Sequence, residues 1–238
     1  MKNLYEVKWG WVKDPEDKRD FPAVKLIYAE MPLPSNYFVY QNTPVYNQGS
    51  HPACVGYACA GVKSDEEYLQ HRGAYLFDGL WLYNACKKID GLPGVDGTYL
   101  RFAMQILQQH GIKQVGFPCF ARRPDSFWQI GAYFRIGNSS ISDFIKQVIF
   151  QYGSIAIGSY WYNSWMNVGE VFPKPDVKDG GHAYRVCGWR NDAPAGWVVV
   201  NSWGKLLWGK AGVAIMPYDM FKSSVLDEGA DLWKLVDK

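Results

Sequence analysis

Apolar residues near the middle of the chain recur with the period of an α-helix. Between residues 141 and 152 they fall three or four residues apart, at Ile141, Phe144, Ile145, Val148, Ile149 and Tyr152. This spacing places them on one face and predicts an amphipathic helix. Ser140 is suited to cap the start of this helix, and Gly153 is suited to end it.

Other segments carry shorter helix and strand patterns. Helix signals also follow Cys54, Asp78 and Thr98, and the last of these predicts a helix from Tyr99 to His110 that Thr98 caps. After Gly153 the chain changes to short apolar runs between Gly, Pro, Asn and Asp, which is typical of strands. The predicted strands are Ser154–Tyr160, Ala183–Cys187, Gly196–Val200 and Gly212–Ile215.

The first 44 residues carry no helical period. Five prolines interrupt them, namely Pro15, Pro22, Pro32, Pro34 and Pro44. We therefore expect an extended N-terminal arm over residues 1–44 that packs on the strand-rich part of the chain. A helix-rich lobe over residues 45–130 and a strand-rich lobe over residues 131–238 then indicate an α+β fold, with the two lobes forming one unit.

Composition excludes several classes of function. The chain has 238 residues, of which 48% are hydrophobic and 20% charged, so it has enough apolar material for a large core. Its net charge of +2 gives no general electrostatic reason for it to bind nucleic acid or a membrane surface. The N-terminus has no apolar segment of a classical signal peptide, and no apolar run is long enough to cross a membrane. A cytoplasmic or virion-associated protein is expected.

The cysteines do not form a metal-binding pattern. There are five, an odd number, and no two have the spacing C-x-x-C: Cys54, Cys59, Cys86, Cys119 and Cys187. Glycine-rich segments such as Gly91–Gly94 lack the lysine and spacing of a phosphate-binding loop. No metal, nucleotide or flavin cofactor is therefore indicated.

Three residues stand in contexts that suit catalysis. Cys54 joins a turn-rich loop to a predicted helix, where free N–H groups and the helix dipole stabilise a thiolate. His182 enters a predicted strand, and Asn201 follows the next one. Cysteine, histidine and asparagine in this order are typical of a nucleophile, a base and a group that orients the base.

Together these segments resemble the papain-like cysteine peptidases. The resemblance covers roughly residues 40–217 and rests on the motifs Asn47-Gln48-Gly49-Ser50, Gly181-His182-Ala183 and Asn201-Ser202-Trp203-Gly204 with Trp208-Gly209. It implies a helical left lobe and an antiparallel, β-barrel-like right lobe, with the active site in the cleft between them.

The resemblance implies a role for each of five residues. Cys54 is the expected nucleophile and His182 the acid and base, acting as a thiolate–imidazolium pair, while Asn201 orients the imidazole. Gln48 is expected to donate its side-chain N–H to the oxyanion, together with the backbone N–H of Cys54. Trp203 is expected to shield the hydrogen bond between Asn201 and His182, although packing in the core explains this tryptophan nearly as well.

The resemblance also indicates where a substrate binds. The family's pocket for the second residue before the scissile bond corresponds here to Gly97, Thr98, Tyr99, Leu100, Gly158 and Ala183. We expect Gly97 and Thr98 to pair with an extended substrate through their backbone groups. None of the six is charged, so an apolar or aromatic substrate residue is expected in a pocket left deep by Gly158 and Ala183. Packing of the lobe interface is the competing interpretation.

Several positions depart from the family. His51 and Val95 stand where the family has a disulfide, and Val55 stands where it has tryptophan. His51 as a second catalytic histidine is a weaker alternative to a solvated loop residue. The roughly 45 residues before the motif are too few for the family's long inhibitory propeptide, and the sequence does not show how premature proteolysis is prevented.

Three functions remain open from the sequence. The first is a cysteine endopeptidase that hydrolyses peptide bonds in a peptide or protein substrate. The second is a papain-like binding or structural module with unused chemistry, for example with an assembly partner in a phage or bacterial particle. The third is acyl transfer or amide hydrolysis on a cell-wall peptide, because the same pair of residues serves water and amine acceptors alike.

Overall fold

The computed structural model describes residues 8–39, 44–71, 73–115, 123–138 and 142–237. The helices are α1 (Cys54–His71), α2 (Gly79–Lys87), α3 (Leu100–Gln109), α4 (Ser142–Tyr152), α5 (Gly204–Leu207) and α6 (Tyr218–Phe221). Shorter turns of helix are η1 (Ala23–Leu26), η4 (Asp125–Trp128), η5 (Asn163–Met166) and η6 (Lys222–Leu226). The strands are β1 (Asn36–Phe38), β2 (Leu76–Phe77), β3 (Gln114–Val115), β4 (Ile130–Ile136), β5 (Ile155–Tyr162), β6 (Lys178–Arg190), β7 (Gly196–Val200), β8 (Val213–Met216) and β9 (Asp231–Asp237).

The main sheet is antiparallel and open. Its strands follow the order β4-β9-β5-β6-β7-β8, and β1 pairs with β6 beside this path. The strand order does not close on itself within the described residues, so the expected description of this lobe as barrel-like holds only loosely. Strand β6 is long enough to pair with β5 along one part and with β7 along another.

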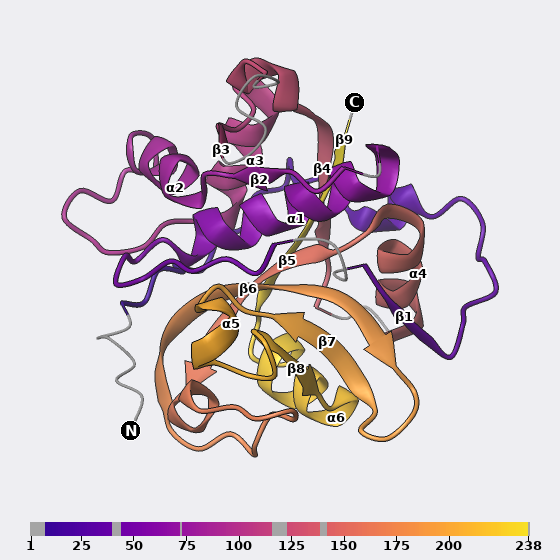
Figure 1. Ribbon diagram of the computed structural model, residues 1–238. Coiled ribbons are helices and arrows are strands. Elements are labelled where there is room, and N and C mark those ends of the chain that lie inside the picture. The colour runs from indigo at the N-terminus through magenta and orange to yellow at the C-terminus, as the bar shows by residue number, and fades with distance from the viewer. Residues whose placement is uncertain (1–7, 40–43, 72, 116–122, 139–141, 238) are drawn as a thin grey trace.

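The helix α1 crosses between the two lobes (Figure 1). One apolar cluster lies within the strand-rich lobe and contains many tryptophans, among them Trp161, Trp189 and Trp197. A second cluster joins α1 and α3 to the sheet and includes both Leu107 of α3 and Leu235 of β9. The start of α1 is therefore held against the sheet by this second cluster, which includes Cys54 and Val55.

The four helices predicted after Cys54, Asp78, Thr98 and Ser140 are all confirmed, and one predicted cap is wrong. Helix α4 ends at Tyr152, as its apolar spacing predicts, and Gly153 follows with a φ of +90°; the predicted cap Ser140 lies outside the described residues. Asp78 caps α2 through a hydrogen bond from the Trp81 N–H (2.9 Å). Thr98 does not cap α3, because Tyr99 holds the N-cap position and makes no side-chain cap bond.

The predicted strands lie in the right places, and only β6 is much longer than predicted. The predicted run Ala183–Cys187 is the centre of the thirteen-residue β6, and Gly196–Val200 matches β7. The sequence did not indicate β4 or β9, although β9 lies between β4 and β5. The described part of the arm has little regular structure, with a turn at residues 18–20, the short turn of helix η1 and the strand β1. Within the described residues, no helix combines the length and apolar character that a bilayer crossing requires.

Candidate active site

Cys54 is the first residue of α1 and follows a loop of tight turns. In this loop Gly49 adopts a φ of +59°, and its N–H donates to the side-chain oxygen of Asn47 (3.0 Å). A positive φ is easily adopted by glycine, which explains this residue in the turn. Cys54 is fully buried and lies where the first turn of the helix leaves N–H groups without helical partners.

The antiparallel pairing of β6 with β7 brings His182 and Asn201 together. The imidazole Nε2 lies 2.8 Å from Oδ1 of Asn201, and the same oxygen accepts the backbone N–H of Ser202 (2.7 Å). Because Oδ1 is the acceptor in both bonds, the hydrogen of the neutral imidazole is on Nε2. The buried Nδ1 has no hydrogen-bond partner among the described residues, so its lone pair is available as a base.

Aromatic rings enclose the imidazole of His182. The ring centroids of Trp161 and Trp203 each lie 4.8 Å from that of the imidazole, Trp161 nearly perpendicular and Trp203 tilted by 35°. Trp203 is itself buried in the core of the strand-rich lobe. Rings at this distance exclude water, and a hydrogen bond such as that between His182 and Asn201 is stronger in a dry environment.

Gln48 is buried in the loop before α1 and is held by two hydrogen bonds. Its Oε1 accepts from the Ser202 hydroxyl (2.7 Å), and its Nε2 donates to the carbonyl of His51 (2.9 Å). An amide nitrogen carries two hydrogens, so one remains for a further acceptor. The side chain of His51 is exposed, and its backbone carbonyl is the group that contacts Gln48.

Burial sets the protonation of the candidate pair. It raises the pKa of the Cys54 thiol to about 12, against the opposing effect of the Ala183 and Gly10 backbone N–H groups. It also lowers the pKa of His182 to about 4, although the hydrogen bond to Asn201 acts in the other direction. At neutral pH this arrangement favours a thiol and a neutral imidazole over the ion pair that the sequence predicts, because both charges would lack solvation.

The N-terminal arm lies against Cys54 and is held there by four backbone hydrogen bonds. The N–H groups of Gly10 and Trp11 both donate to the carbonyl of Gly181 (3.2 and 3.1 Å). The Thr98 N–H donates to the Gly10 carbonyl, and the Val12 N–H donates to the Thr98 carbonyl, both at 3.0 Å. The arm therefore occupies the backbone groups of Thr98 that the family resemblance assigns to a substrate.

Glycines make room for the arm on both sides of the cleft. A Cβ on Gly158 would lie 2.1 Å from the Trp11 ring, and a Cβ on Gly180 would lie 2.2 Å from the Trp9 ring. On the arm itself, a Cβ on Gly10 would lie 2.8 Å from Sγ of Cys54. These separations are too short for carbon atoms, so the arm passes Cys54 only because these side chains are missing.

The predicted pocket at Gly158 is filled by the indole of Trp11. This ring packs edge-on against Tyr160, and its Nε1 donates to Oδ2 of Asp231 (3.1 Å). Asp231 is fully buried at the first position of β9. The sequence reasoning missed this carboxylate, because the strand that carries it was not predicted and lies far from Gly158 in the sequence.

The other predicted pocket residues differ in what they pack against. Leu100 and Ala183 are fully buried in the same apolar cluster as Trp11. The ring of Tyr99 packs on Phe102 of α3, with centroids 5.6 Å apart. Gly97 faces the arm, because a Cβ there would lie 2.8 Å from the Gly10 carbonyl carbon.

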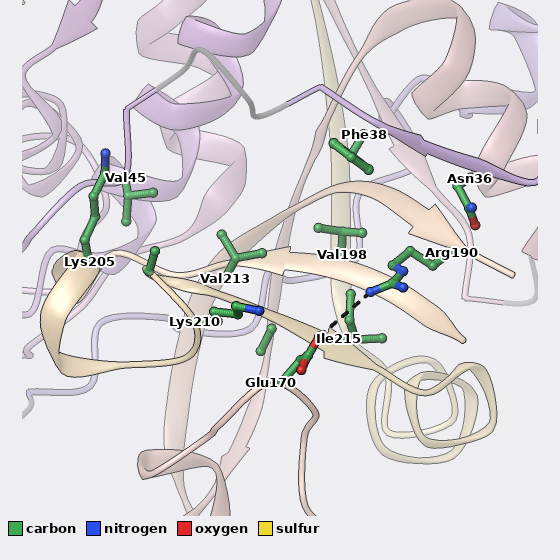
Figure 2. A pocket seen from close by; sticks show the side chains of 12 residues that line it. Asn36, Phe38, Val45, Glu170, Arg190, Val198, Lys205, Lys210, Val213 and Ile215 are labelled. Atoms are coloured by element: carbon green, nitrogen blue, oxygen red, sulfur yellow. Dashed lines mark ion pairs between the residues drawn. The ribbon is translucent and has the colours of Figure 1, made fainter. Parts of the chain in front are cut away.

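A separate cavity of about 640 Å³ lies beside β7 and β8 (Figure 2). Its floor is apolar, and its rim carries Lys205, Lys210 and an ion pair of Arg190 with Glu170 (3.9 Å). Neither Cys54 nor His182 nor Asn201 lines it.

One group of side chains has the spacing of metal ligands. Glu67, His71 and Asp237 bring their donor atoms close together. The ammonium of Lys63 already bridges two of them, at 2.5 Å from Glu67 and 2.7 Å from Asp237. A bound cation would have to compete with this buried charge, so the group does not fit a metal site. Among the described residues, Cys54 and the other cysteines form no disulfide with one another; Cys119 lies outside the described residues.

Comparison with solved structures shows the fold. No protein-family model matches the chain, and no curated protein matches it. It resembles xylellain, a cysteine protease from Xylella fastidiosa, with a TM-score of 0.79 and 21% identity over 100% of this chain and 99% of that one. Procathepsin B from Trypanosoma congolense gives 0.74 and 19% over 98% and 87%, and the bromelain protease from Ananas comosus gives 0.65 and 18% over 87% and 100%. The chain therefore has the papain-like fold.

Proposed function

We propose that the protein is a thiol-dependent hydrolase of peptide bonds whose cleft is held closed by its own N-terminal arm. The observation that carries this proposal is the position of Cys54 against the backbone of Ala183, the residue next to an imidazole oriented by Asn201. Neighbours of the same fold are cysteine proteases, which supports the same chemistry here.

Each group has one role in the proposed reaction. Nδ1 of His182 takes the proton of the Cys54 thiol, and the sulfur attacks the carbonyl carbon of the peptide bond. The oxyanion is stabilised by the Cys54 backbone N–H and the remaining N–H of Gln48. The imidazolium then gives its proton to the leaving amine. Water, deprotonated by the same nitrogen, hydrolyses the thioester and restores the thiol.

This reaction requires the arm to leave the cleft. With the arm in place, the substrate-pairing groups of Thr98 are occupied and Gly10 lies against Cys54. Departure of the arm admits water, which lowers the cost of charging both Cys54 and His182. In this proposal the arm keeps the active site latent until it is released.

The test compares two buried cysteines of the same helix. In a Gly10→Ala background, which displaces the arm, Cys54→Ala should abolish hydrolysis of a fluorogenic peptide, and Cys59→Ala should retain it. Gln48→Ala should lower kcat by roughly 10²–10³ with little change in KM, as for loss of one oxyanion donor. Turnover that survives Cys54→Ala would refute the mechanism.

The arm in the cleft also favours a second candidate, a module whose chemistry is not used. That interpretation predicts an alkylatable Cys54 in the Gly10→Ala variant without any peptide or amide turnover. Amine acceptors and cell-wall peptides belong in the same assay, because acyl transfer to them uses the same thioester.

A further inference from the structure

The arm inserts a carboxylate between two arginines of the body of the protein. Asp20 accepts from Nε and Nη2 of Arg101 at 2.9 and 2.6 Å, and from Nη1 of Arg135 at 3.0 Å. Two parallel bonds from one guanidinium are the geometry in which arginine recognises a carboxylate most strongly. The Arg101 side chain is 8% exposed, so this is a built site and not a surface ion pair.

A second carboxylate of the arm enters the same site. Oδ2 of Asp14 accepts from Nε1 of Trp233 (2.7 Å), and Oδ1 accepts from the backbone N–H of Arg101 (3.2 Å). Both guanidiniums lie over the Trp233 ring, 5.7 Å from its centroid for Arg101 and 5.6 Å for Arg135. We call Arg101, Arg135 and Trp233 the arm site.

The charges of the arm site do not balance without the arm. Arg135 also pairs with Asp231 of the body (2.7 Å). The hydrogen-bond acceptors of the Arg101 guanidinium among the described residues, Asp20 and the Pro15 carbonyl, both belong to the arm. When the arm leaves, the Arg101 guanidinium and the Trp233 indole N–H lose these acceptors, and among the described residues the charge of Arg101 is left without a hydrogen-bonded carboxylate.

We propose that the arm site is a carboxylate subsite, which binds an acidic side chain of a peptide substrate next to the pocket that Trp11 now fills. The inference rests on the proposed function and names its substrate class: acidic peptides that also carry an aromatic residue. The arm itself offers this combination, with Trp11 in the pocket and Asp14 and Asp20 on the arm site.

The arm also contains an acidic residue that serves as a matched control. Asp17 pairs with Arg19 two residues away, and the Arg19 side chain is exposed to solvent. Its loss changes the charge of the arm as much as the loss of Asp20 does, without touching the arm site.

The experiment uses the full chain with Gly10→Ala and Asp20→Asn, which together displace the arm. Binding of fluorescent peptides is measured with Cys54→Ala added, so that the result does not depend on turnover. Each peptide carries one Trp and either Glu or Gln, scanned over the nine positions on each side of the Trp, a range that includes the separations of Asp14 and Asp20 from Trp11. We expect one Glu position to bind roughly 10–100-fold more tightly than its Gln counterpart, as for a charge-assisted hydrogen bond.

Arg101→Gln should remove this preference while leaving the affinity for the Gln peptide within about twofold. Arg101→Lys should restore only part of it, because an ammonium lacks the two-pronged geometry. The Asp17→Asn variant, placed in the Gly10→Ala background instead of Asp20→Asn, should bind the Glu peptide more weakly, because its Asp20 still competes for the site.

Two outcomes would overturn the proposal: equal binding of Glu and Gln peptides at every position, or a Glu preference that survives Arg101→Gln. Failure of the proposed function gives a different result. In that case the peptides still bind with the expected preference, but the chain with Cys54 intact cleaves none of them.

Discussion

The second half of α1 and the arm site use the same kinds of side chain to hold different parts of the molecule. On α1, consecutive acidic residues pair with separate cations: Asp65 with Arg185 (3.0 Å), Glu66 with Lys234 (2.6 Å) and Glu67 with Lys63 (2.5 Å). We call these three pairs the α1 seam. Two of the pairs connect the helix to β6 and β9, and the third lies within α1 itself. The arm site instead connects an extended segment to α3 and β4.

The two clusters differ in how far water is excluded. In the α1 seam the side chains of Lys63, Lys234 and Asp65 are fully buried. In the arm site Asp20 is 10% exposed and Arg135 is 23% exposed. A fully buried charge cannot separate from its partner without unfolding, but a partly exposed one can exchange its partner for water. The comparison indicates that the seam maintains the lobes while the arm site holds a segment that can be released.

Breaking the α1 seam should give the largest effect. Lys234→Met leaves Glu66 buried without its ammonium, and burial already raises the pKa of that carboxyl. We expect the free energy of unfolding in urea to fall by about 3–5 kcal/mol. Adding Glu66→Gln to the same chain should recover most of the loss, since neither charge of this pair then remains. A loss below about 1 kcal/mol for Lys234→Met would show that the seam does not hold the lobes.

Displacing the arm should change reactivity more than stability. In Gly10→Ala the new methyl group would meet the Pro52 carbonyl oxygen at 2.3 Å and Cys54 Sγ at 2.8 Å, so the arm has to move. We expect alkylation of Cys54 by iodoacetamide to accelerate at least tenfold, with a loss of only about 1–2 kcal/mol in stability. Gly49→Ala is the control: its Cβ has open space in the loop before Cys54, although its positive φ costs some stability. Unchanged alkylation in Gly10→Ala would contradict the placement of the arm.

Acid should tighten the arm, and neutral pH should loosen it. Burial, and then the neighbouring Asp231, raise the pKa of Asp14 from 3.8 to about 7, while Trp233 and Arg101 act in the opposite direction. A carboxyl whose pKa is raised in the bound arm stabilises binding of the arm through its protonated form. This stabilisation is fully present below the pKa of the carboxyl in the free arm. This contribution is lost as pH rises from about 4 through about 7, by at most tenfold per pH unit.

Hydrogen exchange at the amides of Trp11 and Val12 measures this release, because both amides donate across the cleft. Asp14→Asn should flatten the dependence. The α1 seam provides an internal comparison, since burial also raises the pKa of Glu67 to about 7. Titration of Glu67 should change the global free energy of unfolding. It should not change the difference in hydrogen exchange between the Asp14→Asn variant and the parent chain. Protection that rises with pH at these two amides would refute the assignment.

The parts that the sequence predicts are those fixed by local pattern. The spacing of Val148 and its neighbours defines α4, and the residues around Cys54, His182 and Asn201 carry their own turn and strand signals. The arm's position was not predictable in this way, because prolines and alternating polar residues say only that it is extended. The contacts of Trp11 with Gly158 and Asp231 bring together three segments that are distant in the sequence. A glycine such as Gly158 also does not indicate in the sequence which side chain fills the space beside it.

The contact between Trp11 and Asp231 joins residues 220 positions apart in the chain. At a synthesis rate of about 5–20 residues per second, the second partner is made on the order of 10–40 s after the first. During that interval the binding site of the arm is incomplete. The walls of the cleft are incomplete as well, since β9 contributes to the same apolar cluster as Cys54. The arm is thus the first of these segments to be synthesised and among the last to reach its place, so that the closing of the cleft and the completion of its walls coincide in time.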